Sequence, residues 1–128
     1  KDSRTNGEER WFNYDVKIFH WNSVRMGDYV YGSIGGNVTM FAAVDINSGD
    51  VKWRERGFHK ALSVAAGDKV IFLDENGVLA LAHVSPDRLD VRSQAQMTSK
   101  VSWTVPTLVG QTLYLRDTEK IMALDVGK

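Results

Sequence analysis

The amino-acid sequence predicts an all-β protein built from about three copies of one four-stranded antiparallel unit. Three observations lead to this prediction: a turn-plus-strand pattern recurs about every 40 residues, the apolar stretches have the length of strands, and turn-forming residues separate them. The composition agrees, because 128 residues with 43% hydrophobic and 25% charged side chains are typical of a globular chain.

A glycine ahead of an apolar strand marks each copy of the unit. Gly27 and Gly67 are 40 positions apart, and Gly67 and Gly110 are 43 apart. A short extended stretch precedes each glycine, and a second apolar run follows it. The chain therefore divides into an N-terminal segment, residues 1–21, and three repeats, residues 22–57, 58–99 and 100–128.

Local signals place four strands in a complete repeat. Residues 70–73 and 78–82 are continuous apolar runs, and the Asn-Gly pair between them readily forms a tight hairpin turn. We expect this hairpin to be buried on both faces. Alternating apolar and charged residues, as in residues 51–54, predict outer strands with one wet face. The predicted strands are 28–33, 40–45, 50–54, 69–73, 78–83, 88–92, 112–115 and 120–124, with no helix longer than two turns.

A four-stranded unit at this period is typical of a β-propeller blade, whose inner strands are covered by neighbouring blades. The third repeat ends after its third strand, and three blades do not readily close a ring. The predicted fold is therefore a partial β-propeller of about three four-stranded antiparallel blades.

The N-terminal segment is rich in aromatic residues and has two interpretations. It is either an outer strand or crossover packed on the core, or an exposed surface for a protein partner or a glycan. We also expect it to pair with residues 120–125, where the third repeat leaves an open edge. If the pairing strand comes from a second copy, a homo-oligomer completes the propeller. The aromatic residues are Trp11, Phe12, Tyr14, Phe19 and Trp21.

Charge and cysteine content exclude several classes of protein. Sixteen basic and sixteen acidic residues cancel, so no net field favours a nucleic-acid partner. The chain has no cysteine, and therefore no disulfide framework or thiolate-bound metal. No apolar stretch reaches the roughly 20 residues that a membrane-spanning helix needs, and the first ten residues are polar.

Motifs for catalysis or metal binding are weak. Residues 74–77 carry oxygen ligands and a glycine but lack the spacing of a calcium loop, so a hairpin turn is the better interpretation. His20, His59 and His83 lie far apart in the sequence, and no serine stands in a nucleophile motif. We therefore predict no catalytic, cofactor-binding or metal-binding residues, no cofactor, and a protein that is not an enzyme.

One stretch carries a family resemblance. Residues 43–53 read Ala-Val-Asp-Ile-Asn-Ser-Gly-Asp-Val-Lys-Trp, and residues 122–125 repeat the opening of this pattern as Met-Ala-Leu-Asp. The pattern resembles the blade signature of pyrroloquinoline-quinone-like repeat proteins, in which Ala-x-Asp precedes a Ser/Thr-Gly turn and an outer-strand tryptophan. The resemblance covers roughly residues 20–128 and includes the outer-membrane assembly lipoprotein family.

The resemblance implies structural roles for four residues. Asp45, Gly49, Trp53 and Asp125 correspond to elements that dock one blade on the next. In the second repeat His83 stands in place of the aspartate, and Val91 is expected at the tryptophan position. Docking is therefore predicted to be uneven along the chain.

The resemblance also implies a function. We expect a non-catalytic scaffold that binds another protein through loops and blade edges, located in the periplasm or outside the cell and forming a C-terminal part of a longer propeller. The alternative is a fragment of a quinone-dependent dehydrogenase or another small-ligand-binding propeller. Fold alone does not decide between them, because propellers support many activities.

Overall fold

The structure, a computed structural model, describes residues 7–127. The rest of the predicted N-terminal segment, residues 1–6, lies outside this range. The described residues form eleven strands and no helix, which confirms the predicted all-β fold. The strands are β1 (Ser23–Met26), β2 (Tyr29–Gly35), β3 (Thr39–Asp45), β4 (Val51–Glu55), β5 (Leu62–Ala66), β6 (Lys69–Leu73), β7 (Val78–Val84), β8 (Leu89–Gln96), β9 (Thr107–Val109), β10 (Thr112–Arg116) and β11 (Ile121–Asp125).

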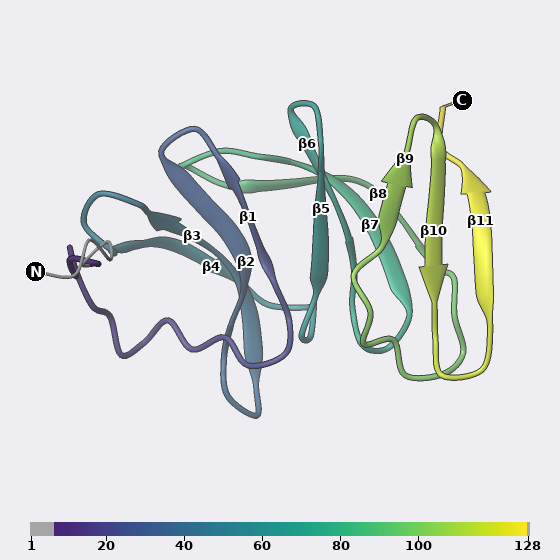
Figure 1. The fold of residues 1–128 in the computed structure, drawn as a ribbon, viewed down its shortest axis with the longest axis horizontal. Helices are drawn as coiled ribbons and strands as arrows, with labels where there is room; N and C mark the ends of the chain where they lie inside the picture. Colours follow the sequence, from purple (N-terminus) through teal and green to yellow (C-terminus); the bar gives the residue numbers. More distant parts are fainter. Residues whose placement is uncertain (1–6, 128) are drawn as a thin grey trace, which may run out of the picture.

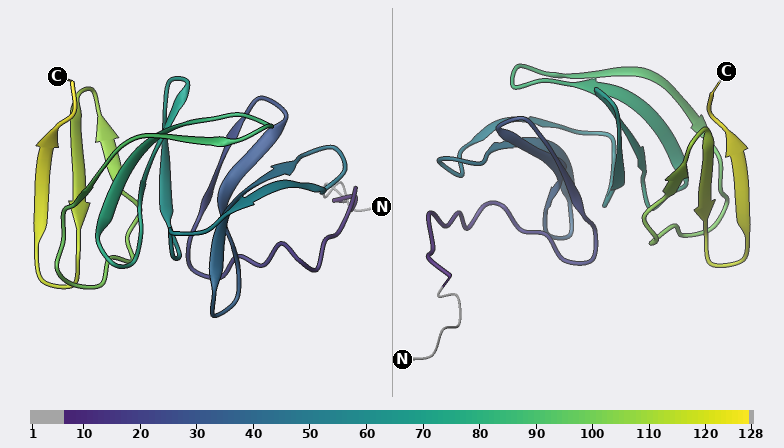
Figure 2. Two further views of the ribbon diagram at one scale, coloured as in Figure 1. Left: turned by 180° about the vertical axis from the view of Figure 1, so that it is seen from behind. Right: turned by 45° about the horizontal axis from the view of Figure 1, so that its top comes forward.

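The strands form three antiparallel sheets in which each strand pairs with its neighbour in the chain. The first blade has the order β1-β2-β3-β4, the second β5-β6-β7-β8 and the third β9-β10-β11. The sheets follow one another along the long axis of the molecule (Figure 1) and fan out in an arc (Figure 2). Contacts between blades include those of β1 with β5 and of β5 with β9, the first strand of each sheet.

The same backbone conformation explains why glycine recurs at the start of each repeat hairpin. Gly27, Gly67 and Gly110 adopt φ angles of 63°, 64° and 58° in the turn after the first strand of each blade. Such left-handed backbone is disfavoured for residues with a Cβ atom, so the tight turn selects glycine. The sequence period of about 40 residues is therefore the period of this hairpin.

The first and second blades share the larger core. Aromatic side chains dominate it, and the rings of Phe41 and Phe72 stack with centroids 4.7 Å apart while Phe58 meets Phe72 edge-on at the same separation. Aromatic pairs in these geometries add stability beyond the area that they bury. Ala43, Val70, Ala80 and Ala82 fill the remaining space from β3, β6 and β7.

The opposite face of β6 packs against the third blade through Ile71 and Leu73, which contact Leu113 and Leu115. The expectation of burial on both faces therefore holds for β6. It fails in part for β7, where Leu79 and Leu81 are only half-buried. On that side the second and third blades separate and leave a cleft.

Two features differ from the predicted elements. Strand β8 continues to Gln96, four residues beyond the expected end, because its pairing with β7 extends to Val78. The first strands of the blades, β1, β5 and β9, lie outside the eight predicted strand ranges, in the short extended stretches expected before the repeat glycines. The third blade has three strands among the described residues, as expected of the third repeat.

Residues 7–21 form no strand and lie beside the first blade. The amide of Gly35 donates a hydrogen bond to the carbonyl of Lys17 (3.0 Å), and the Trp21 indole donates to the Ser33 carbonyl (2.6 Å). The expected pairing of this segment with residues 120–125 does not form among the described residues, where β11 pairs with β10. Three successive sheets hold the two ends of the described chain apart (Figure 1), and the segment's tryptophans are engaged on the first blade.

Candidate functional site

Trp53 joins the first blade to the second. Its indole N–H donates a hydrogen bond of 2.8 Å to the carbonyl of Ser85, which lies in the turn between β7 and β8. Its ring is stacked against Phe41, with centroids 6.4 Å apart, and tilted against Tyr31 at 6.1 Å. The side chain therefore spans the seam between the outer strand β4 and the next sheet.

Asp45 and Gly49 shape the turn that links β3 to β4. The Asp45 Oδ1 atom accepts hydrogen bonds from the amides of Asn47 (2.8 Å) and Ser48 (3.4 Å). The amide of Gly49 donates to the Asp45 carbonyl (2.8 Å), with the glycine at φ 78°. In the third blade, Asp125 Oδ1 accepts from the Gly127 amide at 2.9 Å. The contribution of these residues to blade docking remains a prediction.

Trp11 makes a contact similar to that of Trp53, with its indole N–H on a backbone carbonyl. Its indole N–H donates to the Ile46 carbonyl (2.7 Å), and its ring lies on Gly49 so closely that a Cβ atom there would clash with it. Asn13 donates to the Gly49 carbonyl from the same segment (2.7 Å). Trp11 precedes Trp53 by 42 positions, close to the repeat period. That spacing was the signal that could have identified it.

Strand pairing corrects the position expected for the missing tryptophan of the second blade. Trp53 pairs with Ala43 and Val51 pairs with Val44, so Lys52 is the extra residue of a bulge in β4. In the second blade the bulge lies between Leu81 and Ala82, so the residue opposite Leu81 is Ser93. Ser93, rather than Val91, therefore occupies the tryptophan position. The sequence comparison missed this because the turn before β8 differs in length.

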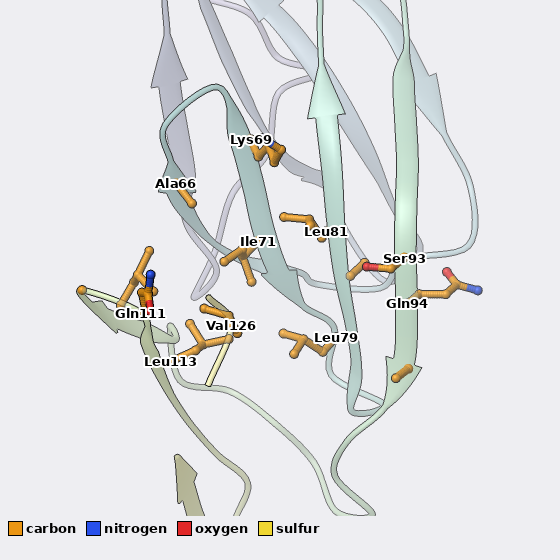
Figure 3. A pocket seen from close by; sticks show the side chains of 14 residues that line it. Ala66, Lys69, Ile71, Leu79, Leu81, Ser93, Gln94, Gln111, Leu113 and Val126 are labelled. Carbon is orange, nitrogen blue, oxygen red and sulfur yellow. The ribbon is translucent and has the colours of Figure 1, made fainter. Parts of the chain in front are cut away.

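A cleft of about 550 Å³ opens between the second and third blades beside Ser93. Its walls are mainly apolar. Figure 3 shows Leu79 and Leu81 between Ser93 on one side and Val126 and Leu113 on the other. Lys69 and Gln111 bring polar groups to the rim. At the corresponding seam between the first and second blades, the Trp53 ring lies against Phe41 and Tyr31.

An aromatic cluster, defined as Phe19, His20, Trp21 and Trp103, lies where the chain enters the first and third blades. The His20 ring is 5.1 Å from Trp21 and 5.5 Å from Trp103, and Phe19 is 5.6 Å from Trp21. Trp21 is buried, whereas Phe19 is 69% and Trp103 56% exposed. The cluster thus presents two large aromatic groups to solvent on a buried support.

Hydrogen bonds hold both tryptophans of the cluster. Trp21 donates to the Ser33 carbonyl, and Trp103 Nε1 donates to Glu75 Oε2 at 3.1 Å. Lys60 forms an ion pair with the same carboxylate oxygen at 3.4 Å. Glu75 of the second blade therefore orients Trp103, which lies in the segment before the third blade.

The acidic turns are structural. The Asp74 carboxylate accepts hydrogen bonds from the amides of Asn76 and Val78, both at 3.0 Å, as expected of a hairpin turn. The equivalent turn of the third blade holds Asp117, which accepts from the amides of Glu119 (2.8 Å) and Lys120 (2.9 Å). These two hydrogen bonds lower the pKa of Asp117 below its ordinary value.

No group of three or more acidic or histidine side chains gathers in metal-binding geometry among residues 7–127. Of the three histidines, His83 faces Asp68 at 3.6 Å and His20 belongs to the aromatic cluster. No helix in the described part of the chain could cross a membrane.

Antiparallel sheets in chain order, in contact through their first strands, define this protein as part of a β-propeller. No protein-family model matches the sequence, and no curated protein matches it. Among solved structures, the chain is similar to BamB from Moraxella catarrhalis, with a TM-score of 0.58 and 20% sequence identity. The match covers 79% of this chain and 30% of that one. The chain therefore has a BamB-like propeller fold and corresponds to less than a third of that protein.

Proposed function

We propose that this protein is a non-catalytic β-propeller scaffold that holds another protein through the aromatic cluster. The observation that carries the proposal is the exposure of Phe19 and Trp103 in one cluster with the buried Trp21, with Trp103 hydrogen-bonded to Glu75. Aromatic side chains, tryptophan above all, dominate the binding energy of protein interfaces. Monomeric proteins rarely expose large apolar groups together without a binding role.

Pre-organisation strengthens the case for this surface. The cost of immobilising side chains on binding is reduced where they are already held in place. Trp103 is held by Glu75, which Lys60 holds in turn, and the His20 ring fills the space between the two tryptophans. Neutral overall charge favours a partner recognised by apolar contacts rather than by long-range attraction.

The proposed location is the periplasm or the cell exterior. It is supported by the resemblance of the sequence to the outer-membrane assembly lipoprotein family, together with the BamB-like fold.

Site-specific photo-crosslinking tests the proposal. A photoreactive phenylalanine analogue at position 19 or 103 is expected to capture one discrete partner, whereas the same group at the exposed Tyr114 captures none. The purified partner should bind the Phe19→Ser/Trp103→Ser variant about 30-fold more weakly, the effect of losing about 2 kcal/mol at an interface hot spot. Tyr114→Ser is the matched control.

Two outcomes contradict the proposal. One is a partner that binds the double variant as tightly as the parent chain. The other is a bound chromophore and dye reduction after incubation with pyrroloquinoline quinone and calcium, which favours the quinone-dependent alternative.

A further inference from the structure

We propose that the cleft between the second and third blades binds a tryptophan side chain supplied by a partner protein. This inference deepens the proposed function and rests on it, because the partner that contacts the aromatic cluster would be held at a second point. The cleft is continuous with the interface between the two blades, where Ile71 and Leu113 are in contact.

Internal repetition assigns the occupant. Ser93 lies opposite Leu81 beside a β-bulge, as Trp53 lies opposite Ala43 beside the equivalent bulge. An indole projecting from the Ser93 position would enter the cleft, since Ser93 lines it. The seam between the second and third blades therefore has space for a docking tryptophan, but a serine stands at the position that would supply it.

The acceptor for an indole N–H is present as well. Trp11 donates to the carbonyl of Ile46, whose own amide donates to the Asp28 carbonyl at 2.9 Å. In the third blade Val126 makes the same backbone bond to Gln111 at 2.8 Å, so Val126 is the equivalent of Ile46. Val126 lines the cleft on the side away from Ser93 (Figure 3).

The size and chemistry of the cleft fit an aromatic side chain. Its volume of about 550 Å³ lies within the range of ligand pockets, and apolar walls with a few polar groups are typical of such sites. Lys69, whose ammonium group donates to Asp68 Oδ1 at 2.9 Å, also lines the cleft, where its alkyl stem can pack against an aromatic ring.

The tryptophans of this chain are engaged elsewhere. Their indole N–H groups donate to Ile46, Ser33, Ser85 and Glu75. None of these four side chains lines the cleft, and we assign the indole that enters it to the partner protein.

Nuclear magnetic resonance titration of the full chain with N-acetyl-tryptophan amide tests the site. The probe should shift the amides of Leu81, Ser93 and Val126 saturably, with nuclear Overhauser contacts between its ring and the Leu79 and Leu81 methyl groups. The 1-methyl derivative, which lacks the N–H donor, should bind about five-fold more weakly, the effect of one hydrogen bond. N-acetyl-leucine amide should not bind measurably.

Variants at position 93 provide the controls. Ser93→Ala should bind the probe within about two-fold of the parent, because a surface hydroxyl far from the indole acceptor contributes little. Ser93→Trp should abolish probe binding and raise the Tm, since its own indole fills the cleft. Val91→Trp adds the same group at an exposed position of β8 outside the lining of the cleft and should change neither property.

The origin of the tryptophan is tested by crosslinking from Ala95, which also lines the cleft. The expected product contains the partner captured from positions 19 and 103, whereas a product containing two copies of this chain would overturn the assignment to a partner protein. Absence of probe contacts with Leu79 and Leu81, or equal binding of the leucine amide, would overturn the tryptophan site even if Ser93→Trp does not fold. The titration does not use Phe19 or Trp103, so its failure is distinguishable from failure of the proposed function.

Discussion

At the scale of single residues, indole groups link segments that are distant in the sequence. Trp53 reaches Ser85 and Trp11 reaches Ile46, each with a ring on an apolar surface and an N–H on a backbone carbonyl. Tryptophan suits this position because one side chain both fills the seam and satisfies a carbonyl in a turn.

Trp53→Ala is expected to destabilise the protein by about 3 kcal/mol. This is the lower end of the usual cost of truncating a tryptophan, because the Trp53 side chain is only half-buried. Trp53→Phe keeps the ring contacts with Phe41 and loses only the hydrogen bond to Ser85, so it should cost about 1 kcal/mol. Urea denaturation followed by circular dichroism measures both. Equal stability of Trp53→Ala and the parent would show that the seam does not depend on this residue.

The carboxylate of Asp117 should make stability depend on pH. Its pKa is lowered in the folded state by the amides of Glu119 and Lys120, so folding favours the ionised form. This stabilisation is complete above the unfolded-state pKa of about 4. It is lost as the pH falls through the lower pKa of the folded state.

Asp117→Asn is accordingly expected to lower the Tm at pH 7, and the difference from the parent should narrow below about pH 4. Thermal melts at several pH values measure the gap. Asp87→Asn, at an exposed position in the β7–β8 turn, is the control and should show no such convergence. A Tm difference between Asp117→Asn and the parent that stays constant with pH would contradict the stabilising role of the Asp117 carboxylate.

At the scale of elements, β11 is the strand most exposed to unwanted pairing. It is an edge of the third sheet in the described chain, and Ile121 on it is 70% exposed. Open edges with exposed apolar residues are sites of association between chains. Pairing of this edge with a second copy remains a prediction.

Ile121→Lys should reduce any self-association, because a charged side chain on an edge strand disfavours pairing. Sedimentation over a range of protein concentrations is the measurement. Val38→Lys, an exposed apolar position in the hairpin between β2 and β3, serves as the matched control and should leave the mass unchanged. Association that is insensitive to Ile121→Lys would place the contact elsewhere.

At the scale of the whole molecule, the arc of three blades keeps residues 7–21 of the N-terminal segment away from β11 (Figure 2). The segment instead covers the first blade through Trp11 and Trp21. Its removal should therefore affect stability rather than expose the edge of the third blade.

Deletion of residues 1–21 is expected to cost about 3 kcal/mol or more, since it removes a buried tryptophan, Trp21. For a chain of this size the loss corresponds to a fall of roughly 10 °C in Tm. A variant that lacks residues 1–9 retains Trp11 and Trp21, and its Tm in a calorimetric scan should be close to that of the parent. A Tm unchanged by the longer deletion would refute the covering role.

Much of the fold was predictable from local signals. The positive φ at Gly27, Gly67 and Gly110 selects glycine at a fixed period, and strand-length apolar runs follow each turn. These signals placed the strands to within a few residues, since turn conformation and alternation of burial depend on neighbours in the sequence. The turn residues Asp45 and Gly49 were likewise visible in the pattern of residues 43–53.

The seams between blades depended on the tertiary structure. The turn before β8 differs in length from the turn before β4, so only the register shows that Ser93 rather than Val91 corresponds to Trp53. The aromatic cluster joins residues 19–21 to Trp103, and the cleft joins Ser93 to Val126, through contacts between separate sheets. Such contacts arise from how the sheets pack, and no local preference along the chain encodes them.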